Sequence, residues 1–268
     1  MNPSHWVPLL LLAPGPLGAA DADIAVDLRS RVEAFKGTGE WREVSLRQSL
    51  PVANTAVLIC DMWDKHWCRS ATERVNGLVE KMAPFLEAAR QRGFQIIHAP
   101  SETMAFYRDA PQRKRMLELA RIDPPAPLSL PDPPLPIDDK GGGCDTADKF
   151  YTAWTREHPG LRIAEADVVS DNGAEIYSFL RSRDIRTLLV MGVHTNMCVL
   201  NRSFAIKKMT ALGIRCILVR DLTDAMYDPR DAPRVSHAEG TQLVIGHIEK
   251  YWCPTTTSAD LLRAFGRP

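Results

Sequence analysis

Short apolar runs alternate along the chain with longer segments in which apolar residues recur every three or four positions. Such a run, bounded by polar residues, is typical of a buried strand, and its alternation with amphipathic helices indicates a parallel sheet. The runs span residues 55–60, 94–98, 166–169, 187–193 and 215–219, with a short sixth near 253–257. We therefore predict an α/β protein with a mainly parallel six-stranded sheet in the order 3-2-1-4-5-6.

Helices are expected between these strands. In the segment after the first strand, apolar residues from Val75 to Ala89 step mostly by three and four, which places them on one buried helix face, and Gly93 ends the helix. Similar spacing predicts helices over residues 102–121, 173–183, 198–212 and 237–251, and a last helix from Ser258.

Two segments depart from this alternation. Residues 122–144 contain seven prolines and three glycines, which exclude a helix or a central strand. The flanking segments each resemble half of one sheet, so we interpret 122–144 as a surface insertion in a single domain spanning 23–268.

Residues 1–22 combine a short apolar run with small residues around Ala20, as in a secretory signal. We expect export, and a cytoplasmic protein if this leader is not a signal.

Composition narrows the function classes. The chain has 268 residues, with 33 Lys and Arg against 33 Asp and Glu, and it therefore carries no net charge. Nucleic-acid binding needs a basic excess, so no nucleic-acid partner is expected. The apolar run of the leader is too short to span a membrane. What remains is a soluble, enzyme-sized protein.

The sharpest chemical candidate follows the fourth strand. That strand ends at Val193, the chain turns through 194–196, and Cys198 falls in the first turn of the next predicted helix. A helix N-terminus lowers a thiol pKa, and free N–H groups in the same turn can hold an oxyanion. Cys198 is therefore a candidate nucleophile, although a small buried core cysteine has the same local sequence.

Asp61 directly follows the fully apolar first strand. A partly desolvated carboxylate at this point has a raised pKa and can accept a thiol proton. The alternative uses of Asp61 are a helix cap or a salt bridge. Because the first and fourth strands are neighbours in the predicted order, their ends bring Asp61 and Cys198 together as base and nucleophile.

At these residues the chain resembles the isochorismatase-like cysteine hydrolase superfamily, which includes nicotinamidases and N-carbamoylsarcosine amidohydrolase. The resemblance rests on Asp61, on LLVMGVHTNMCV (188–199) and on LVRDLTDAMYD (218–228), and it covers roughly residues 53–251. It implies a three-layer α/β/α sandwich, a homo-oligomer, a Cys198 nucleophile and an Asp61 base. It also implies a cis Val193–His194 peptide, with the backbone N–H groups of His194 and Cys198 as the oxyanion hole.

One member of the family pattern is missing. The family places a catalytic lysine just past the third strand, but Val169 is followed here by Ser-Asp-Asn-Gly. We expect Lys65, soon after Asp61, to supply the positive charge, with His66 and the more distant Lys149 as alternatives.

The remaining polar and aromatic residues at the strand ends are expected to line a substrate pocket: Trp63, His66, His98, Thr195 and Asn196. No cofactor is predicted. Zinc is the alternative, held by Asp64, His66 and His98, but these residues lack the spacing of metal ligands. Cys68, Cys144 and Cys253 lie in polar or loop contexts, where two of them can form a disulfide after export.

The leading hypothesis is a hydrolase that cleaves a C–N amide-type bond of a small molecule through a Cys198 thiolate and an acyl-enzyme. A second hypothesis is a family scaffold that has lost turnover and binds a ligand or partner, because the family lysine is missing. A third is a metal-assisted hydrolase.

Overall fold

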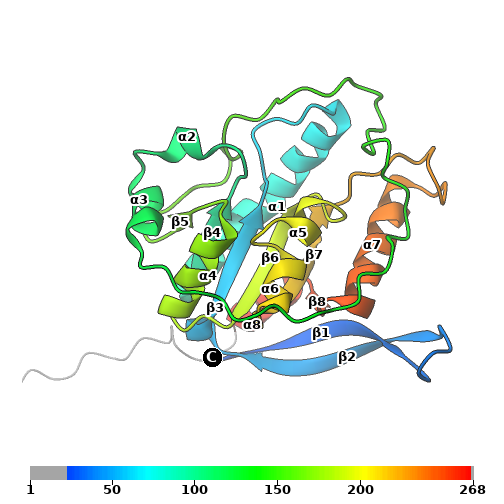
Figure 1. Ribbon diagram of the computed structural model, residues 1–268, viewed down its shortest axis with the longest axis horizontal. Helices are drawn as coiled ribbons and strands as arrows, with labels where there is room; N and C mark the ends of the chain where they lie inside the picture. The colour runs from blue at the N-terminus through cyan, green and yellow to red at the C-terminus, as the bar shows by residue number, and fades with distance from the viewer. Residues whose placement is uncertain (1–22, 267–268) are drawn as a thin grey trace, which may run out of the picture.

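The computed structural model describes residues 23–266, so the predicted leader at 1–22 lies outside the described residues. Eight strands form one sheet in the order β2-β1-β8-β7-β6-β3-β4-β5 (Figure 1). They are β1 (Ile24–Glu33), β2 (Trp41–Leu50), β3 (Thr55–Cys60), β4 (Gln95–Ala99), β5 (Val168–Val169), β6 (Thr187–Val193), β7 (Arg215–Asp224) and β8 (Thr255–Thr256). The six predicted strands are β3 to β8, and they lie in the predicted order and run parallel.

Helices cover both faces of the sheet, which confirms the three-layer sandwich. They are α1 (Arg69–Arg92), α2 (Met104–Tyr107), α3 (Pro111–Glu118), α4 (Gly173–Ser182), α5 (Cys198–Asn201), α6 (Ile206–Ala211), α7 (His237–Tyr251) and α8 (Ser258–Phe265). Side chains alternate between two cores along each strand. Leu58 packs with residues of α4 to α7, whereas Ile59 packs with residues of α1 and α8.

The antiparallel hairpin β1–β2 was not predicted. It adds two strands beyond β8, in a register that runs from Ile24 opposite Leu50 to Glu33 opposite Trp41. Both strands alternate polar and apolar residues, and Gly37 and Gly39 lie in the turn with positive φ. This period of two marks a half-exposed strand, so the signal was present, but it differs from the continuous apolar runs of a buried parallel strand.

Two predicted helices are each broken into a pair. The segment 102–121 forms α2 and α3 because Pro111 starts α3 and cannot continue a preceding helix. The segment 198–212 forms α5 and α6, with residues 202–205 in a turn between them. This leaves Cys198 on a helix of only four residues.

Gly192 sets how closely β3 and β6 approach just before the site. Its φ is +114°, and a Cβ at this position would lie 2.0 Å from the carbonyl oxygen of Cys60. Only glycine fits both the backbone conformation and the space. The end of β3, which leads to Asp61, and the end of β6, which leads to Cys198 in α5, are therefore held side by side.

Residues 119–167, here called the connecting segment, join α3 to β5 and contain no helix or strand in the described structure. They include the Pro-rich residues 122–144. Hydrogen bonds tie the segment to the body, as from Asp138 N–H to the Ala232 carbonyl (2.8 Å). A disulfide joins its Cys144 to Cys68, just before α1, so one of the expected pairings is present. Among residues 23–266, no helix is long and apolar enough to cross a bilayer.

Candidate active site

Asp61 lies at the carboxyl end of β3 and is fully buried, in a left-handed backbone conformation (φ +48°). Its Oδ1 accepts a hydrogen bond from the Ser101 N–H (2.7 Å), and its Oδ2 accepts one from Arg202 Nε (2.9 Å). Burial raises the pKa of Asp61, while Arg202 and Ser101 act in the opposite direction. Asp61 is therefore a desolvated carboxylate whose ionised form depends on these two donors.

Cys198 lies beside Asp61, and a side-chain hydrogen bond couples the two groups. The backbone of His194 also acts on the sulfur, and it lowers the thiol pKa. The Val193–His194 peptide bond is cis, at the position that the family resemblance implies. The predicted nucleophile, the predicted base and the cis peptide thus lie together just beyond the ends of β3 and β6.

The thiol of Cys198 is protonated at rest. Burial, together with the charge of Asp61, raises its pKa to about 12, against the opposing effects of Arg202 and the His194 N–H. The expected lowering of this pKa by a helix N-terminus is therefore wrong. Because α5 has only four residues, its dipole is too small to outweigh burial beside a carboxylate.

Arg202 is a residue of this candidate site that was not predicted from the sequence. Besides Asp61, it contacts Glu102 Oε1 at 3.3 Å, and its guanidinium lies 6.0 Å from the Trp63 ring centroid. Arg202 is four positions after Cys198, and residues at this spacing lie on the same side of a helical turn. This spacing is the sequence feature that could have predicted a position for Arg202 near Cys198. The cation that pairs with Asp61 is therefore Arg202, whereas Lys65 lies over the Tyr151 ring, 5.7 Å from its centroid.

Aromatic rings gather beside this group. Trp63 is buried and stacks on Trp154 of the connecting segment, with ring centroids 4.4 Å apart. His66 lies nearly parallel to both rings and meets His194 edge-on at 4.9 Å. Burial lowers the pKa of His66 to about 4 and that of His194 to about 3. Both imidazoles are therefore neutral near pH 7, and the Nε2 of His194 is buried without a partner.

Thr195 and Asn196, both predicted to line the pocket, lie beside Cys198 but are tied to the protein. The Thr195 hydroxyl bonds to that of Thr223 (2.7 Å). Asn196 bonds to the backbone of Met226 through both ends of its amide and donates to Asp139 (2.9 Å). Asn196 still borders an open cleft of about 450 Å³, which Cys198, Asn201 and Arg202 also line.

His98, predicted to line the pocket, is fully buried in β4 away from this cleft. Its Nδ1 lies 2.7 Å from Glu157 and its Nε2 lies 3.0 Å from Asp167. Burial alone lowers the pKa of His98, but the two carboxylates outweigh it and raise the pKa to about 9. His98 therefore anchors the connecting segment to the sheet as a buried cation.

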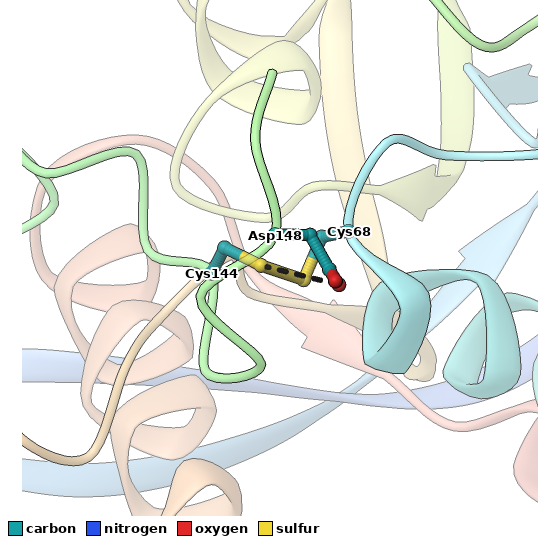
Figure 2. Close-up of side chains that lie close together, drawn as sticks. All are labelled: Cys68, Cys144 and Asp148. Atoms are coloured by element: carbon teal, nitrogen blue, oxygen red, sulfur yellow. Dashed lines mark hydrogen bonds between the residues drawn. A yellow bond between two sulfur atoms is a disulfide. The ribbon is translucent and has the colours of Figure 1, made fainter. Parts of the chain in front are cut away.

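The three residues suggested as zinc ligands are not brought together as a set. His98 is held by two carboxylates, and Asp64 accepts hydrogen bonds from Thr155. A different cluster, Cys68, Cys144 and Asp148, places its ligand atoms within 4.8 Å of one another (Figure 2). Its two sulfurs are bonded to each other, and a disulfide sulfur is not the thiolate that zinc binds. These residues therefore do not fit a zinc centre.

Comparison with known proteins supports the fold. A similar solved structure is a cysteine hydrolase from Pseudomonas syringae pv. phaseolicola 1448A, with 20% identity, a TM-score of 0.53, and coverage of 81% of this chain and 94% of that one. Another is an isochorismatase family protein from Desulfovibrio vulgaris subsp. vulgaris str. Hildenborough, with 19% identity, a TM-score of 0.47, and coverage of 80% and 99%. No curated protein matches the chain.

The sequence model of the isochorismatase domain matches residues 55–260, from the first residue of β3 into α8. Because this match spans most of the chain, the protein belongs to the isochorismatase family.

Proposed function

We propose that this protein is a thiol-dependent hydrolase that cleaves a C–N amide-type bond of a small molecule. The observation that carries the proposal is the contact of Asp61 with both Cys198 and Arg202, next to the cis Val193–His194 peptide. A buried carboxylate coupled to a thiol and a fixed donor is the arrangement that acyl transfer needs.

The raised thiol pKa defines the first step. Burial beside Asp61 keeps the Cys198 thiol protonated, and the ion pair with Arg202 favours the carboxylate form of Asp61, so Asp61 accepts the thiol proton as sulfur attacks the carbonyl carbon. The carbonyl oxygen gains the negative charge, which the N–H groups of His194 and Cys198 stabilise. The proton on Asp61 then passes to the leaving nitrogen as the C–N bond breaks, and an acyl-thioester remains on Cys198.

The second half reverses these roles with water. Asp61 removes a proton from water as the water oxygen attacks the thioester, and the C–S bond breaks. The sulfur regains a proton from Asp61, and the carboxylic acid leaves. The neutral imidazoles of His66 and His194 and the rings of Trp63 and Trp154 favour an uncharged substrate portion.

An activated acyl donor tests this mechanism without knowledge of the natural substrate. Incubation with p-nitrophenyl acetate should release about one equivalent of p-nitrophenol in a rapid burst. Intact-mass and peptide mapping should then place one acetyl group on Cys198. Ammonia release from a panel of primary amides and N-carbamoyl compounds then ranks substrates. Absence of both the burst and the Cys198 adduct would support a non-catalytic scaffold instead.

Replacement of Arg202 is expected to weaken catalysis and change its pH dependence. Arg202 lowers the pKa of Asp61, so in Arg202→Gln the Asp61 pKa rises and the acidic limb of the rate profile moves to higher pH. We expect a rate loss of about 100-fold at neutral pH, because fewer molecules hold an ionised base. Arg202→Lys retains the charge and should recover part of the rate.

The measurement is the pH profile of acylation from pH 4 to 10, with circular dichroism as a check on folding. Arg186→Gln is the matched control, because Arg186 pairs with Asp184 at the surface. An unchanged acidic limb in Arg202→Gln would show that Arg202 has only a structural role.

A further inference from the structure

The outer edge of the sheet is formed by β2, outside the region that matches the family model. β2 pairs with β1 on one side, and the described structure pairs no strand with its other side. The hairpin also carries exposed apolar side chains: Val32 is 46% exposed, Phe35 71% and Leu46 60%. In Figure 1 the hairpin extends along the bottom of the molecule, beyond the helical layers.

This edge carries the charged residues Arg42, Glu43 and Arg47, but it lacks the other devices that usually prevent pairing. An edge strand presents unpaired N–H and C=O groups, and proteins usually interrupt such an edge with proline, a bulge or a short strand. β2 is ten residues long and contains neither proline nor glycine, and its register with β1 has no bulge. A long, regular edge of this kind accepts another strand readily.

The sequence of β2 is complementary to itself in one antiparallel register. If two copies pair about a twofold axis at Ser45, Glu43 of each lies opposite Arg47 of the other. On the other face of the sheet, Val44 lies opposite Leu46, so the most exposed apolar residue of β2 gains an apolar neighbour. Opposite charges and apolar pairs at such positions stabilise a sheet.

Other registers lose this match. A twofold axis at Val44 or at Leu46 places Glu43 opposite Ser45 or Ser49, and no ion pair forms. An axis at Glu43 or at Arg47 places identical charges opposite each other, which is unfavourable. The charge pattern therefore selects Ser45 as the centre. Glu43 and Arg47 are each about half exposed and have only long ion-pair contacts within the hairpin, at 3.5–3.6 Å.

We propose that β2 pairs antiparallel with β2 of a second copy of this chain, centred on Ser45, and joins the two sheets into one. The occupant of the edge is another molecule of the same protein because the strand complements its own charges and apolar positions. This inference is independent of the proposed chemistry at Cys198.

Charge exchange tests the register. Wild-type protein should sediment as a dimer, whereas Glu43→Arg and Arg47→Glu should each place two like-charged pairs at the interface. We expect each single variant to raise the dimer dissociation constant at least about tenfold. The double variant restores opposite charges and should return the constant close to the wild-type value. Glu40→Arg is the matched control, because it changes the net charge equally but lies opposite Leu50.

Cross-linking provides an independent readout. In the proposed register two copies of Ser45→Cys face each other, so mild oxidation should give a covalent dimer on a non-reducing gel. Ser49→Cys, on the same strand and face, lies opposite Trp41 and should not cross-link. A monomeric wild type, a dimer unaffected by both single charge variants, or cross-linking through Ser49→Cys but not Ser45→Cys would each overturn the proposal. Circular dichroism verifies that every variant folds.

Discussion

Cys198→Ala is expected to abolish the burst of p-nitrophenol and to reduce amide turnover by about 10⁴-fold or more. In the proposed mechanism the variant removes the atom that bonds to the acyl carbon, and Asp61 cannot replace it because its two oxygens are held by Ser101 and Arg202. The loss of one sulfur at a site that borders an open cleft should leave the fold intact. The measurement combines burst amplitude, steady-state ammonia release and the mass of the protein after incubation.

Cys216→Ala is the matched control for this prediction. Cys216 is also a free cysteine, but it lies in β7 against the core and takes no part in the site. Its replacement should preserve the burst amplitude, although the protein loses some stability. A Cys198→Ala protein that still hydrolyses amides at the wild-type rate would exclude Cys198 as the nucleophile.

The predictable part of the fold was the part buried on both faces. β3, β6 and β7 read as continuous apolar runs because helices cover each side of the parallel sheet. The β1–β2 hairpin was missed because half-exposed strands alternate polar and apolar residues instead. The breaks at Pro111 and after Asn201 were missed because helical periodicity continues across them.

The candidate site also shows which features local sequence can predict and which depend on contacts between distant parts of the chain. Asp61 and Cys198 were predictable because each follows a buried strand, and the strand order places those ends together. Arg202 was missed because its importance depends on a contact with Asp61, 141 positions earlier in the chain. His98 is the last residue of a predicted strand, and Asp61 directly follows another, so the sequence placed both at the site. In the structure the side chain of His98 is instead held by Glu157 and Asp167. Both partners follow the Pro-rich residues 122–144, whose path local sequence does not encode.

Arg202 places a positive charge beside Asp61 in a chain that lacks the family lysine. The segment after β5 contains Asp171, which accepts a hydrogen bond from the Glu102 N–H, and Glu102 in turn binds Arg202. This chain therefore brings its positive charge to Asp61 from the turn after α5 rather than from the end of β5. An arginine stays charged at any working pH, so it favours the ionised form of Asp61 without exchanging protons itself.

Asp61→Asn is expected to separate the reactivity of the thiol from catalysis. Asparagine keeps the shape of the side chain, can still accept the Ser101 N–H, and tolerates the left-handed backbone at this position. Without a base, acylation and amide turnover should fall about 10³-fold.

The same substitution should make Cys198 more reactive toward iodoacetamide. Burial is the largest cause of the high thiol pKa, and the charge of Asp61 is the second largest. Removal of that charge leaves Arg202 free to stabilise a thiolate. The thiol pKa therefore falls below about 12, and the alkylation rate at pH 8 should rise by about tenfold or more. Arg202→Gln should slow the alkylation of Cys198, because Arg202 lowers the thiol pKa.

Peptide mapping of carboxamidomethylated Cys198 against time measures this rate, with the buried Cys216 as the internal reference. Slower alkylation of Cys198 in Asp61→Asn would contradict the coupling of the two groups. Unchanged turnover would remove Asp61 as the base. Faster alkylation together with lost turnover would indicate a carboxylate that acts on a protonated thiol, because a thiolate already formed at pH 8 would gain little reactivity from the removal of Asp61.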